Sequence, residues 1–327
     1  MRAVVIGSGL GGVTVAETLA KSGTHDVTLV TAETLGYYSR PRLSHGMALA
    51  DQAAEKILMK RYEALPFAVL AGTTVERIDR QNQRVVLQSG KTLDYDVLVL
   101  ATGSAARVPP PLVKCEGFLT LNSLDELHKL RARRREALGR GATPRWAIVG
   151  GGLIGSELAS DLRKAGDEVT IFHREPRLIE LILTEAQSRA LHEHFVRAGV
   201  DVRYRQDVRS VSAHEVVTAE GPVGPFDGVV VATGFAPRVE LAREADLPTK
   251  RGIVTDAFLR TADPKIYAVG DVAEIEGRLY PFVSPIRHQA LWLAQHLEAR
   301  ASGAWPAPAF KPVIKVHGFN AEQAATA

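Results

Sequence analysis

The order of apolar and polar positions repeats once along this chain. A first copy starts with an apolar run at residues 3–6, continues with helical spacing up to Gly23, and returns to an apolar run at 27–30. A second copy has such runs at 146–149 and 169–172, and the helical stretch between them also stops at a glycine. Strand, helix and strand in this order predict a βαβ unit with parallel strands. The pattern therefore indicates an α/β protein with two related units.

Both copies also end alike. Short alternating strands, found between residues 75 and 94 in the first copy, precede a fully apolar strand. That strand runs into Ala-Thr-Gly at 101–103 in the first copy and at 232–234 in the second. The first copy is the longer one, mainly because it carries an insertion at 37–56. Extra sequence in a duplicated unit is a natural place to look for function.

A glycine-rich fingerprint joins the first strand and the helix of each copy. It reads Gly-Ser-Gly-Leu-Gly-Gly at 7–12 and Gly-Gly-Gly-Leu-Ile-Gly at 150–155. In G-x-G-x-x-G the first glycine makes the tight turn, the second lets a pyrophosphate approach the backbone, and the third lets helix pack on strand. The pyrophosphate then lies at the positive end of the helix. One such motif is weak evidence, but two in the same context predict two Rossmann-like dinucleotide-binding domains.

A further apolar strand at 266–269 runs into Gly270 and Asp271. A carboxylate at the end of a buried strand is able to accept hydrogen bonds from the ribityl hydroxyls of a flavin. A surface turn also accommodates Gly-Asp, but the apolar strand before it makes that explanation the poorer one. Two dinucleotide sites and this carboxylate predict a bound flavin and a second, exchanging dinucleotide.

Composition narrows the class of protein. The 327 residues suit two domains, and 46% hydrophobic residues allow a large core. The net charge of +3 is too small to indicate nucleic acid, and no apolar run is long enough for a membrane span. Cys115 is alone, which excludes a disulfide or a cysteine-based metal cage, and the histidines lack ligand spacing, so no metal site is predicted. With no signal-peptide pattern at Met1, we expect a cytoplasmic protein.

The chain resembles the two-dinucleotide, glutathione-reductase-like flavoprotein reductases, and within them the NAD(P)H-dependent rubredoxin and flavorubredoxin reductases. This resemblance implies FAD in the first Rossmann unit and near Asp271, and NADH or NADPH in the second unit. It implies an FAD-binding domain at 1–107, an NAD(P)-binding domain at 108–236 and a return to the FAD domain at 237–300. The resemblance rests on VVIGSGLGGVTVA, YYSRPRLSHGM, LVLATG, LTLNS, IVGGGLIGSELA, VVATGFAPR and IYAVGDVAEIEG.

Three departures from the family pattern matter. The region of the first helix lacks the Cys-x4-Cys of disulfide reductases. His45, in Leu-Ser-His-Gly, stands where thiol-dependent relatives have a reactive cysteine, and imidazole cannot cycle through a sulfenate or a disulfide. Finally, Phe310–Lys315 resembles the first strand of a C-terminal interface domain, of which 301–327 would be a truncated stub. We therefore expect reduced flavin to pass electrons directly to an acceptor.

The resemblance also implies two catalytic residues. It places Glu157 in the first turn of the second Rossmann helix, beside the nicotinamide, and Arg40 where relatives have a lysine beside the flavin. We expect these two to form an ion pair. Two plainer explanations stay open: an acidic residue in the first helical turn is favoured by the helix dipole, and Arg40 fits an ordinary surface charge.

The residue type at the end of the second strand of each unit indicates which form of the adenosine ribose is bound. An acid there holds a 2′-hydroxyl, whereas a basic residue tolerates a 2′-phosphate. His173 and Arg174 occupy this place in the second unit, which favours NADPH, although Glu175 is close enough to compete. In the first unit Glu33 is expected to hold the FAD ribose.

The predicted cofactor residues follow from the fingerprints, the Ala-Thr-Gly ends and the resemblance. Those expected to contact FAD are Gly7, Gly9, Leu10, Gly11, Gly12, Glu33, Arg40, Pro41, Ala101, Thr102, Gly103, Gly270, Asp271, Pro281 and Phe282. Those expected to contact NAD(P)H are Gly150, Gly152, Leu153, Ile154, Gly155, Glu157, His173, Arg174, Thr233 and Gly234.

The resemblance favours a rubredoxin or flavorubredoxin as the electron acceptor, because residues 39–44 suit that branch better, and the ferredoxin of a dioxygenase system is the alternative. A different class is a protein that binds or senses FAD and NAD(P)H without fast turnover. A small acidic redox protein would suit the basic stretch at 129–135, although a solvated helix face is the simpler explanation for it. The sequence leaves the oligomeric state undecided.

Overall fold

The computed structural model describes residues 1–49 and 57–325 and divides into two compact units. Unit 1 comprises residues 1–39, 58–105 and 236–311. Unit 2 comprises the described residues of 40–57, 106–235 and 312–327. The chain thus leaves and re-enters unit 1. The described residues of the segment 40–57, which we placed with the first dinucleotide domain, group with unit 2 in this division.

The centre of unit 1 is a five-stranded parallel sheet with the strand order β20-β9-β1-β2-β5. Ile6 is in register with Val30 on one side and with Leu100 on the other, so three strands end at one level. Their apolar residues are almost continuously buried, as expected for a parallel sheet covered on both faces. The strands are β1 (Arg2–Ile6), β2 (Asp26–Val30), β5 (Ala68–Leu70), β9 (Val97–Leu100) and β20 (Ile266–Ala268).

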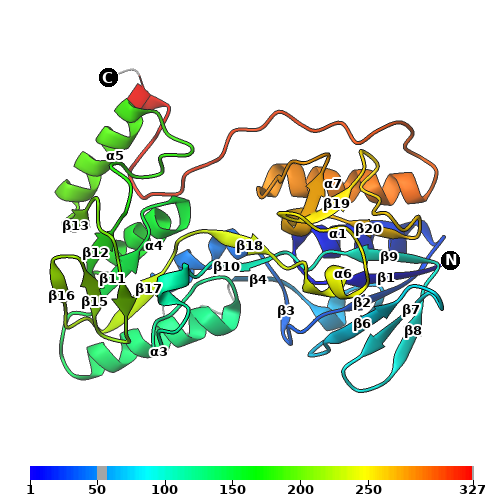
Figure 1. Ribbon diagram of the computed structural model, residues 1–327, viewed down its shortest axis with the longest axis horizontal. Coiled ribbons are helices and arrows are strands. Elements are labelled where there is room, and N and C mark those ends of the chain that lie inside the picture. The colour runs from blue at the N-terminus through cyan, green and yellow to red at the C-terminus, as the bar shows by residue number, and fades with distance from the viewer. Residues whose placement is uncertain (50–56, 326–327) are drawn as a thin grey trace. The chain divides into compact units, whose positions relative to one another are not determined.

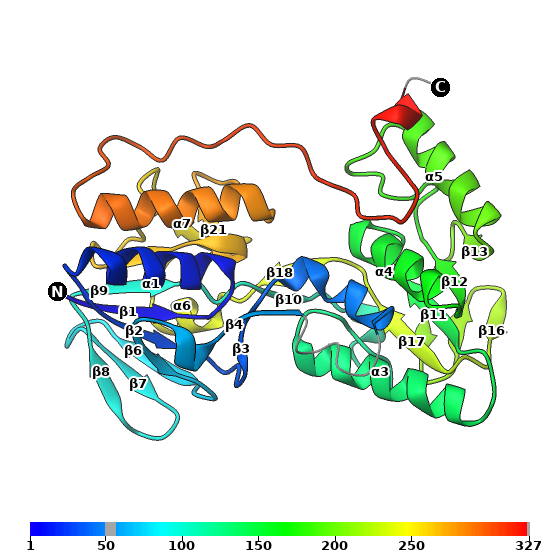
Figure 2. The ribbon, with the colours of Figure 1, turned by 180° about the vertical axis from the view of Figure 1, so that it is seen from behind.

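Helices α1 and α7 pack side by side over one face of this sheet, and the meander β6-β7-β8 lies on the other (Figures 1 and 2). Helix α1 ends at Gly23 in a left-handed conformation, as its sequence predicts. The covering elements are α1 (Leu10–Ser22), α7 (Val283–Leu297), β6 (Val75–Asp79), β7 (Arg84–Leu87) and β8 (Thr92–Asp94). The rest of unit 1 is β3 (Gly36–Tyr38), β4 (Leu58–Arg61), η3 (Tyr62–Ala64), α6 (Glu240–Glu244), β19 (Ile253–Thr255), η5 (Gly270–Val272) and β21 (Ala273–Ile275).

Unit 2 repeats the plan with a parallel sheet of strand order β13-β12-β11-β17. Helix α4 packs on β11 and β12, α5 on β13, and α3 on β17 (Figure 1). Helices α3 and α5 each begin with a capping box, formed by Ser123 with Glu126 and by Thr184 with Gln187. The sheet strands are β11 (Arg145–Val149), β12 (Glu168–Phe172), β13 (Val200–Arg203) and β17 (Gly228–Val231), and the helices are α3 (Leu124–Gly139), α4 (Leu153–Lys164) and α5 (Glu185–Arg197).

The smaller elements of unit 2 include the antiparallel sheet β14-β15-β16. A two-stranded sheet of β10 and β18 marks where the chain passes from one unit to the other. The smaller elements of unit 2 are η1 (Arg40–Arg42), η2 (Ser44–Met47), η4 (Pro110–Leu112), β14 (Ser210–Val211), β15 (Val216–Thr218), β16 (Gly221–Val223) and η6 (Gln323–Ala325). The two strands at the passage of the chain are β10 (Ser104–Ala106) and β18 (Phe235–Pro237).

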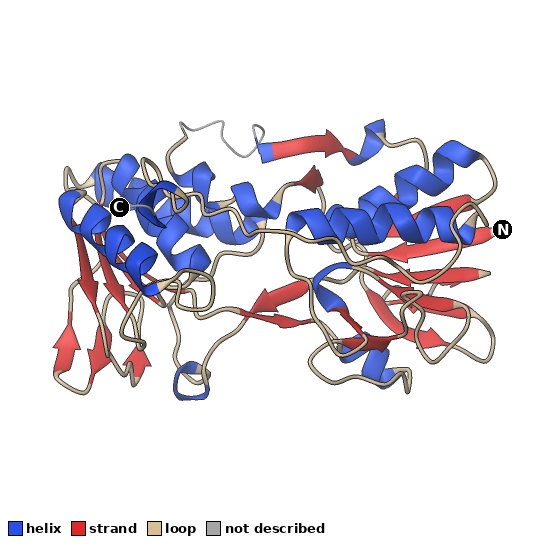
Figure 3. Cartoon of the chain, turned by 90° about the horizontal axis from the view of Figure 1, so that it is seen from above, coloured by secondary structure: helices blue, strands red, loops and turns tan. Residues whose placement is uncertain are grey.

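The predicted α/β architecture with two Rossmann-like units is confirmed, and Figure 3 shows the layers of helix and strand in each unit. One predicted element is wrong. Within the described residues, no strand forms at Phe310–Lys315. A strand needs a neighbour to pair with, whereas here the backbone N–H of Lys315 donates to the Glu157 carboxylate at 3.0 Å. No helix in the described part of the chain is long and apolar enough to cross a membrane.

Candidate functional site

The first candidate site lies at the carboxyl edge of the unit 1 sheet. The fingerprint follows β1, Ala101–Gly103 follows β9, and Gly270 follows β20, and these three strands are neighbours. Because parallel strands end on the same side, their loops meet at one edge, where open α/β sheets bind ligands. The structure therefore brings together segments that are more than 160 residues apart in sequence.

The glycines of the first fingerprint have distinct steric roles. Gly7 has φ +107°, and a Cβ there would lie 2.2 Å from the carbonyl oxygen of Ala101. A Cβ on Gly12 would lie 1.9 Å from the carbonyl oxygen of Gly7. At Gly9, by contrast, a Cβ would meet no described atom within 4 Å, and among the described side chains none caps the first turn of α1. This open, uncapped helix start fits the pyrophosphate of a dinucleotide.

At the same edge, two polar side chains that the sequence analysis missed hold Asp271 and the adjacent Gly270. Ser104 Oγ donates to Asp271 Oδ2 at 2.7 Å. The backbone N–H of the adjacent Gly270 donates to Gln289 Oε1 at 2.8 Å, and Gln289 is fully buried in α7. Gln289 Nε2 is a buried donor with no partner among the described residues. A fixed carboxylate beside a spare buried donor is compatible with the hydroxyl-rich chain of a flavin cofactor.

Glu33 lies just beyond β2 in a small polar network. Its carboxylate oxygen Oε1 accepts a hydrogen bond from the Tyr38 hydroxyl at 2.6 Å, and its backbone N–H donates to Thr31 Oγ1 at 3.2 Å. The Ser8 hydroxyl connects Thr31 Oγ1 at 2.8 Å with the Tyr62 hydroxyl at 2.7 Å. The sequence carried no periodic signal for this network, since its members come from four separate segments.

Two more predicted FAD residues begin helix α7. Phe282 is its N-cap and packs against Phe310 with ring centroids 5.0 Å apart, while Pro281 is exposed. Helix α7 also contacts η5, which contains Asp271. Thr102, at the edge of the fingerprint, donates its hydroxyl to the carbonyl oxygen of Arg238 at 3.0 Å.

The second candidate site repeats this geometry in unit 2. A Cβ on Gly150 would lie 2.4 Å from the carbonyl oxygen of Ala232, and one on Gly155 would lie 1.9 Å from that of Gly150. At Gly152, the N-cap of α4, a Cβ would meet no described atom within 4 Å, and no described side chain caps the helix. The same open helix start therefore exists twice, at Leu10 and Leu153.

The structure changes the interpretation of His173. This side chain is 6% exposed, its Nδ1 accepts from the Gly151 backbone N–H at 3.0 Å, and its Nε2 lies 3.0 Å from the carbonyl oxygen of Arg177. The Nδ1 atom thus holds the glycine turn, whereas Nε2 faces Arg177 and also lies 3.2 Å from Glu180 Oε2. Arg174 is different: its side chain is 80% exposed and pairs with Glu175 at 3.0 Å. Of the two side chains, only that of Arg174 is exposed.

At the end of β17, Thr233 and Gly234 are tied to the segment that follows β10. Thr233 Oγ1 donates to the carbonyl oxygen of Arg107 at 2.6 Å, and the Arg107 N–H donates to the carbonyl oxygen of Gly234 at 2.9 Å. Gly234 has φ +106°, and a Cβ there would meet no described atom within 4 Å. The loop is therefore fixed at its backbone and open beside the glycine.

Glu157 lies in the second turn of α4, not in the first as predicted, because the helix starts at Leu153. Its carboxylate is buried and accepts from Lys315 twice, from the backbone N–H at 3.0 Å and from Nζ at 3.1 Å. Lys315 Nζ also donates to the carbonyl oxygen of Pro41 at 2.7 Å. The guanidinium of Arg40 instead donates to the carbonyl oxygen of Asn122. The predicted Arg40–Glu157 ion pair is therefore wrong, and the cation beside Glu157 comes from the C-terminal segment.

The basic stretch at 129–135 is partly internal. Arg131 is buried in α3 and donates to the carbonyl oxygens of Gly46 and Leu49. Arg134 pairs with the fully buried Asp167 at 2.8 Å. Two of its arginines therefore hold unit 2 together, which neither the docking hypothesis nor the solvated-face explanation anticipated.

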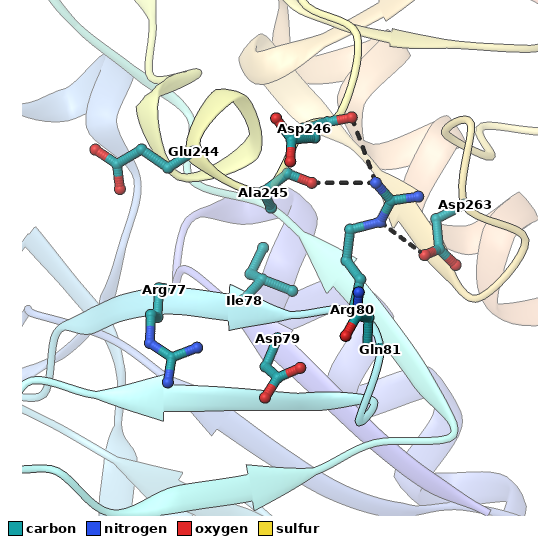
Figure 4. A pocket seen from close by; sticks show the side chains of 9 residues that line it. All are labelled: Arg77, Ile78, Asp79, Arg80, Gln81, Glu244, Ala245, Asp246 and Asp263. Atoms are coloured by element: carbon teal, nitrogen blue, oxygen red, sulfur yellow. Dashed lines mark hydrogen bonds and ion pairs between the residues drawn. The ribbon is translucent and has the colours of Figure 1, made fainter.

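A surface hollow in unit 1 is separate from the predicted cofactor residues (Figure 4). Arg80 stands in it, with its Nε 3.0 Å from Asp263 Oδ2 and its Nη1 3.2 Å from the carbonyl oxygen of Ala245. These bonds connect the β6-β7 turn to α6, so the guanidinium is used in packing. The residues around the hollow are Arg77, Ile78, Asp79, Arg80, Gln81, Glu244, Ala245, Asp246 and Asp263.

Comparisons with known proteins agree with two dinucleotide sites. A family model described as pyridine nucleotide-disulphide oxidoreductase matches residues 1–301. The nitric oxide reductase FlRd-NAD(+) reductase of Salmonella gallinarum is 35% identical over 302 residues, which cover 90% of this chain and 78% of that protein. The crystal structure of a ferredoxin reductase from Rhodopseudomonas palustris matches with a TM-score of 0.85 at 28% identity, over 94% of this chain and 78% of that one. Putidaredoxin reductase in covalent complex with putidaredoxin matches with a TM-score of 0.80 at 30% identity, over 91% and 75% of the two chains.

Proposed function

Since the chain belongs to the pyridine nucleotide-disulphide oxidoreductase family and is an FAD-dependent NAD(P)H oxidoreductase, we propose that it passes electrons from NAD(P)H through FAD to a small redox protein. The observation that carries the proposal is the pair of open, uncapped helix starts at Gly9 and Gly152, one in each unit. His45 stands where a thiol mechanism would need cysteine. Electrons must therefore leave the flavin directly.

Bound FAD supplies hydride acceptance and electron release, and the chain supplies position and electrostatics. We propose that the N-termini of α1 and α4 hold the two pyrophosphates, and that Asp271, fixed by Ser104, accepts hydrogen bonds from the flavin side chain. Glu157 and Lys315 are positioning residues in this scheme. Their contact places a carboxylate and an ammonium together at the second turn of α4.

We propose a rubredoxin or flavorubredoxin as the acceptor. The FlRd-NAD(+) reductase relative supports this choice through its identity of 35%. A ferredoxin is the second candidate, supported by the similarity to the ferredoxin reductase and putidaredoxin reductase structures at 28% and 30% identity. We also propose a small acidic partner, because Lys129 and Arg135 of the basic stretch are exposed on α3 and would attract an acidic protein.

The acceptor is tested by a parallel reduction assay. Purified protein loaded with one FAD per chain is mixed with NADH or NADPH and, separately, with rubredoxin, flavorubredoxin, ferredoxin and ferricyanide. We expect the largest kcat/KM with rubredoxin or flavorubredoxin. A preference for ferredoxin would select the second candidate. Flavin reduction by NAD(P)H without turnover on ferricyanide or any protein would indicate a binding or sensing protein and contradict the enzymatic proposal.

We further propose that Arg174 favours NADPH through its 2′-phosphate, with Glu175 as the competing group for a 2′-hydroxyl. Arg174→Ala should raise the KM for NADPH about tenfold, and that for NADH by less, because only NADPH has a phosphate to pair with the guanidinium. Arg189→Ala is the matched control, since this exposed arginine likewise pairs with a glutamate, at 3.4 Å. Equal changes for both cofactors would show that Arg174 points away from the ribose.

A further inference from the structure

Three potential metal ligands from distant segments meet in unit 2. His45 lies in η2, Asp161 in α4 and His317 in the C-terminal segment. His45 Nδ1 is 2.9 Å from Asp161 Oδ1, and His317 Nε2 is 2.7 Å from the same oxygen. One ligand atom from each residue lies within 4.8 Å of the others. Because the three are 116 and 156 residues apart in pairs, no local spacing in the sequence signalled this cluster.

The carboxylate at its centre is buried and faces two imidazoles. Asp161 is 0% exposed, and its side-chain partners among the described residues are the two imidazoles, with no arginine or lysine paired to it. Burying an isolated carboxylate is costly, and a cation held between the carboxylate and the two imidazoles would offset that cost. Two imidazoles and a carboxylate are ligands that Zn²⁺ and similar divalent transition metals prefer.

The cluster is also accessible from one side. The side chains of His45 and His317 are 34% and 36% exposed, whereas that of Asp161 is 1% exposed. An ion thus has a route in, and water has room to complete its coordination. Ligand atoms about 2.0–2.1 Å from a tetrahedral ion lie roughly 3.3 Å apart. An ion would therefore widen the two nitrogen–oxygen distances to Asp161 Oδ1 by a few tenths of an ångström, within a cluster whose ligand atoms already lie within 4.8 Å of one another.

The ammonium group of Lys164 lies next to this cluster. Lys164 Nζ lies 3.4 Å from His317 Nδ1. Metal binding at Nε2 puts a proton on Nδ1, which removes this contact. Lys164 is exposed at the end of α4, so its side chain is able to turn into solvent.

We propose that His45, Asp161 and His317 bind one divalent transition-metal ion of the Zn²⁺ class. The ion would fasten the C-terminal segment to α4, where the backbone N–H of His317 already donates to Ser160 Oγ at 2.8 Å. Asp161 is one helical turn beyond Glu157, and His317 is two residues beyond Lys315. The metal therefore stabilises the segment that carries Lys315 to Glu157.

The test uses the full chain with FAD bound, freed of metal by a chelator and titrated with Zn²⁺ in a calorimeter and with Co²⁺ in a spectrophotometer. We expect one ion per chain, with micromolar or tighter affinity, and Co²⁺ absorption bands typical of nitrogen and oxygen ligands. Zn²⁺ should also slow tryptic cleavage of the C-terminal segment. His45→Ala and His317→Ala should each weaken binding about tenfold or more.

The matched control is His128→Ala, which removes an exposed histidine of α3 outside the cluster and should leave Zn²⁺ binding unchanged. Asp161→Asn should weaken binding as well, and if this buried variant fails to fold, the two exposed histidines still decide the question. Circular dichroism checks the fold of each variant. No saturable binding, or binding that all three cluster variants leave unchanged, would overturn the proposal.

Discussion

Replacing Gly12 with alanine should leave the protein colourless and unstable. The new Cβ would lie 1.9 Å from the carbonyl oxygen of Gly7, which is backbone and cannot turn aside as a side chain does. Overpacking of a close contact costs about 1–3 kcal/mol, and a backbone clash belongs at the upper end of that range. The measurements are thermal unfolding by circular dichroism and the FAD absorbance that remains after gel filtration.

Substitutions at two further glycines distinguish an effect on folding from an effect on FAD binding. Gly9→Ala should leave the unfolding temperature of the FAD-free chain unchanged but weaken FAD binding, because its Cβ enters the open space at the start of α1. Gly139→Ala, at the end of α3 with no described atom near its Cβ, should change neither property. Full retention of FAD by both Gly9→Ala and Gly12→Ala would show that the pyrophosphate lies elsewhere.

Replacing Glu157 with alanine should slow the reduction of the flavin by NAD(P)H about tenfold or more, equivalent to about 1.4 kcal/mol, while FAD content stays nearly unchanged. The carboxylate is buried, and its removal leaves the ammonium of Lys315 without its ion-pair partner. Breaking a fully buried pair costs about 3–5 kcal/mol, and the 29% exposure of Lys315 reduces that figure. The measurement is stopped-flow absorbance of the flavin under single-turnover conditions.

The pairing itself is tested by a double-mutant cycle. Lys315→Ala should slow the same step, and the double variant should be less impaired than the product of the two single losses. Arg40→Ala provides the comparison, because Arg40 bonds to Asn122 and its effect should multiply with that of Glu157→Ala. Multiplicative effects for Glu157 with Lys315 would contradict the pair, and unchanged reduction in both single variants would remove these residues from the site.

The chemistry around Glu157 could be predicted only in part. The resemblance paired this glutamate with Arg40, whereas the structure pairs it with Lys315. Lys315 lies 158 residues from Glu157, and nothing in either local pattern connects them. His173 is a second example: its position after β12 predicted a ligand contact, whereas in the structure its Nδ1 accepts from the Gly151 N–H and its Nε2 lies beside the carbonyl oxygen of Arg177. A position in a motif identifies a place on the fold, and the partners at that place depend on the path of the rest of the chain.

The two Rossmann-like units could be predicted from the sequence alone. The spacing of apolar residues and the glycine positions of the fingerprint are local signals that extend over about thirty residues. Gly7 and Gly12 could be identified from their place in the fingerprint, although the close contact at Gly7 is with Ala101 after a neighbouring strand. Only the tertiary structure decided what the segment at 310–317 does. A strand exists only where another strand accepts its hydrogen bonds, and here Glu157 and Ser160 accept them from Lys315 and His317 instead. The histidine–aspartate cluster has the same origin, since Asp161 acquires its two imidazoles from segments more than a hundred residues away.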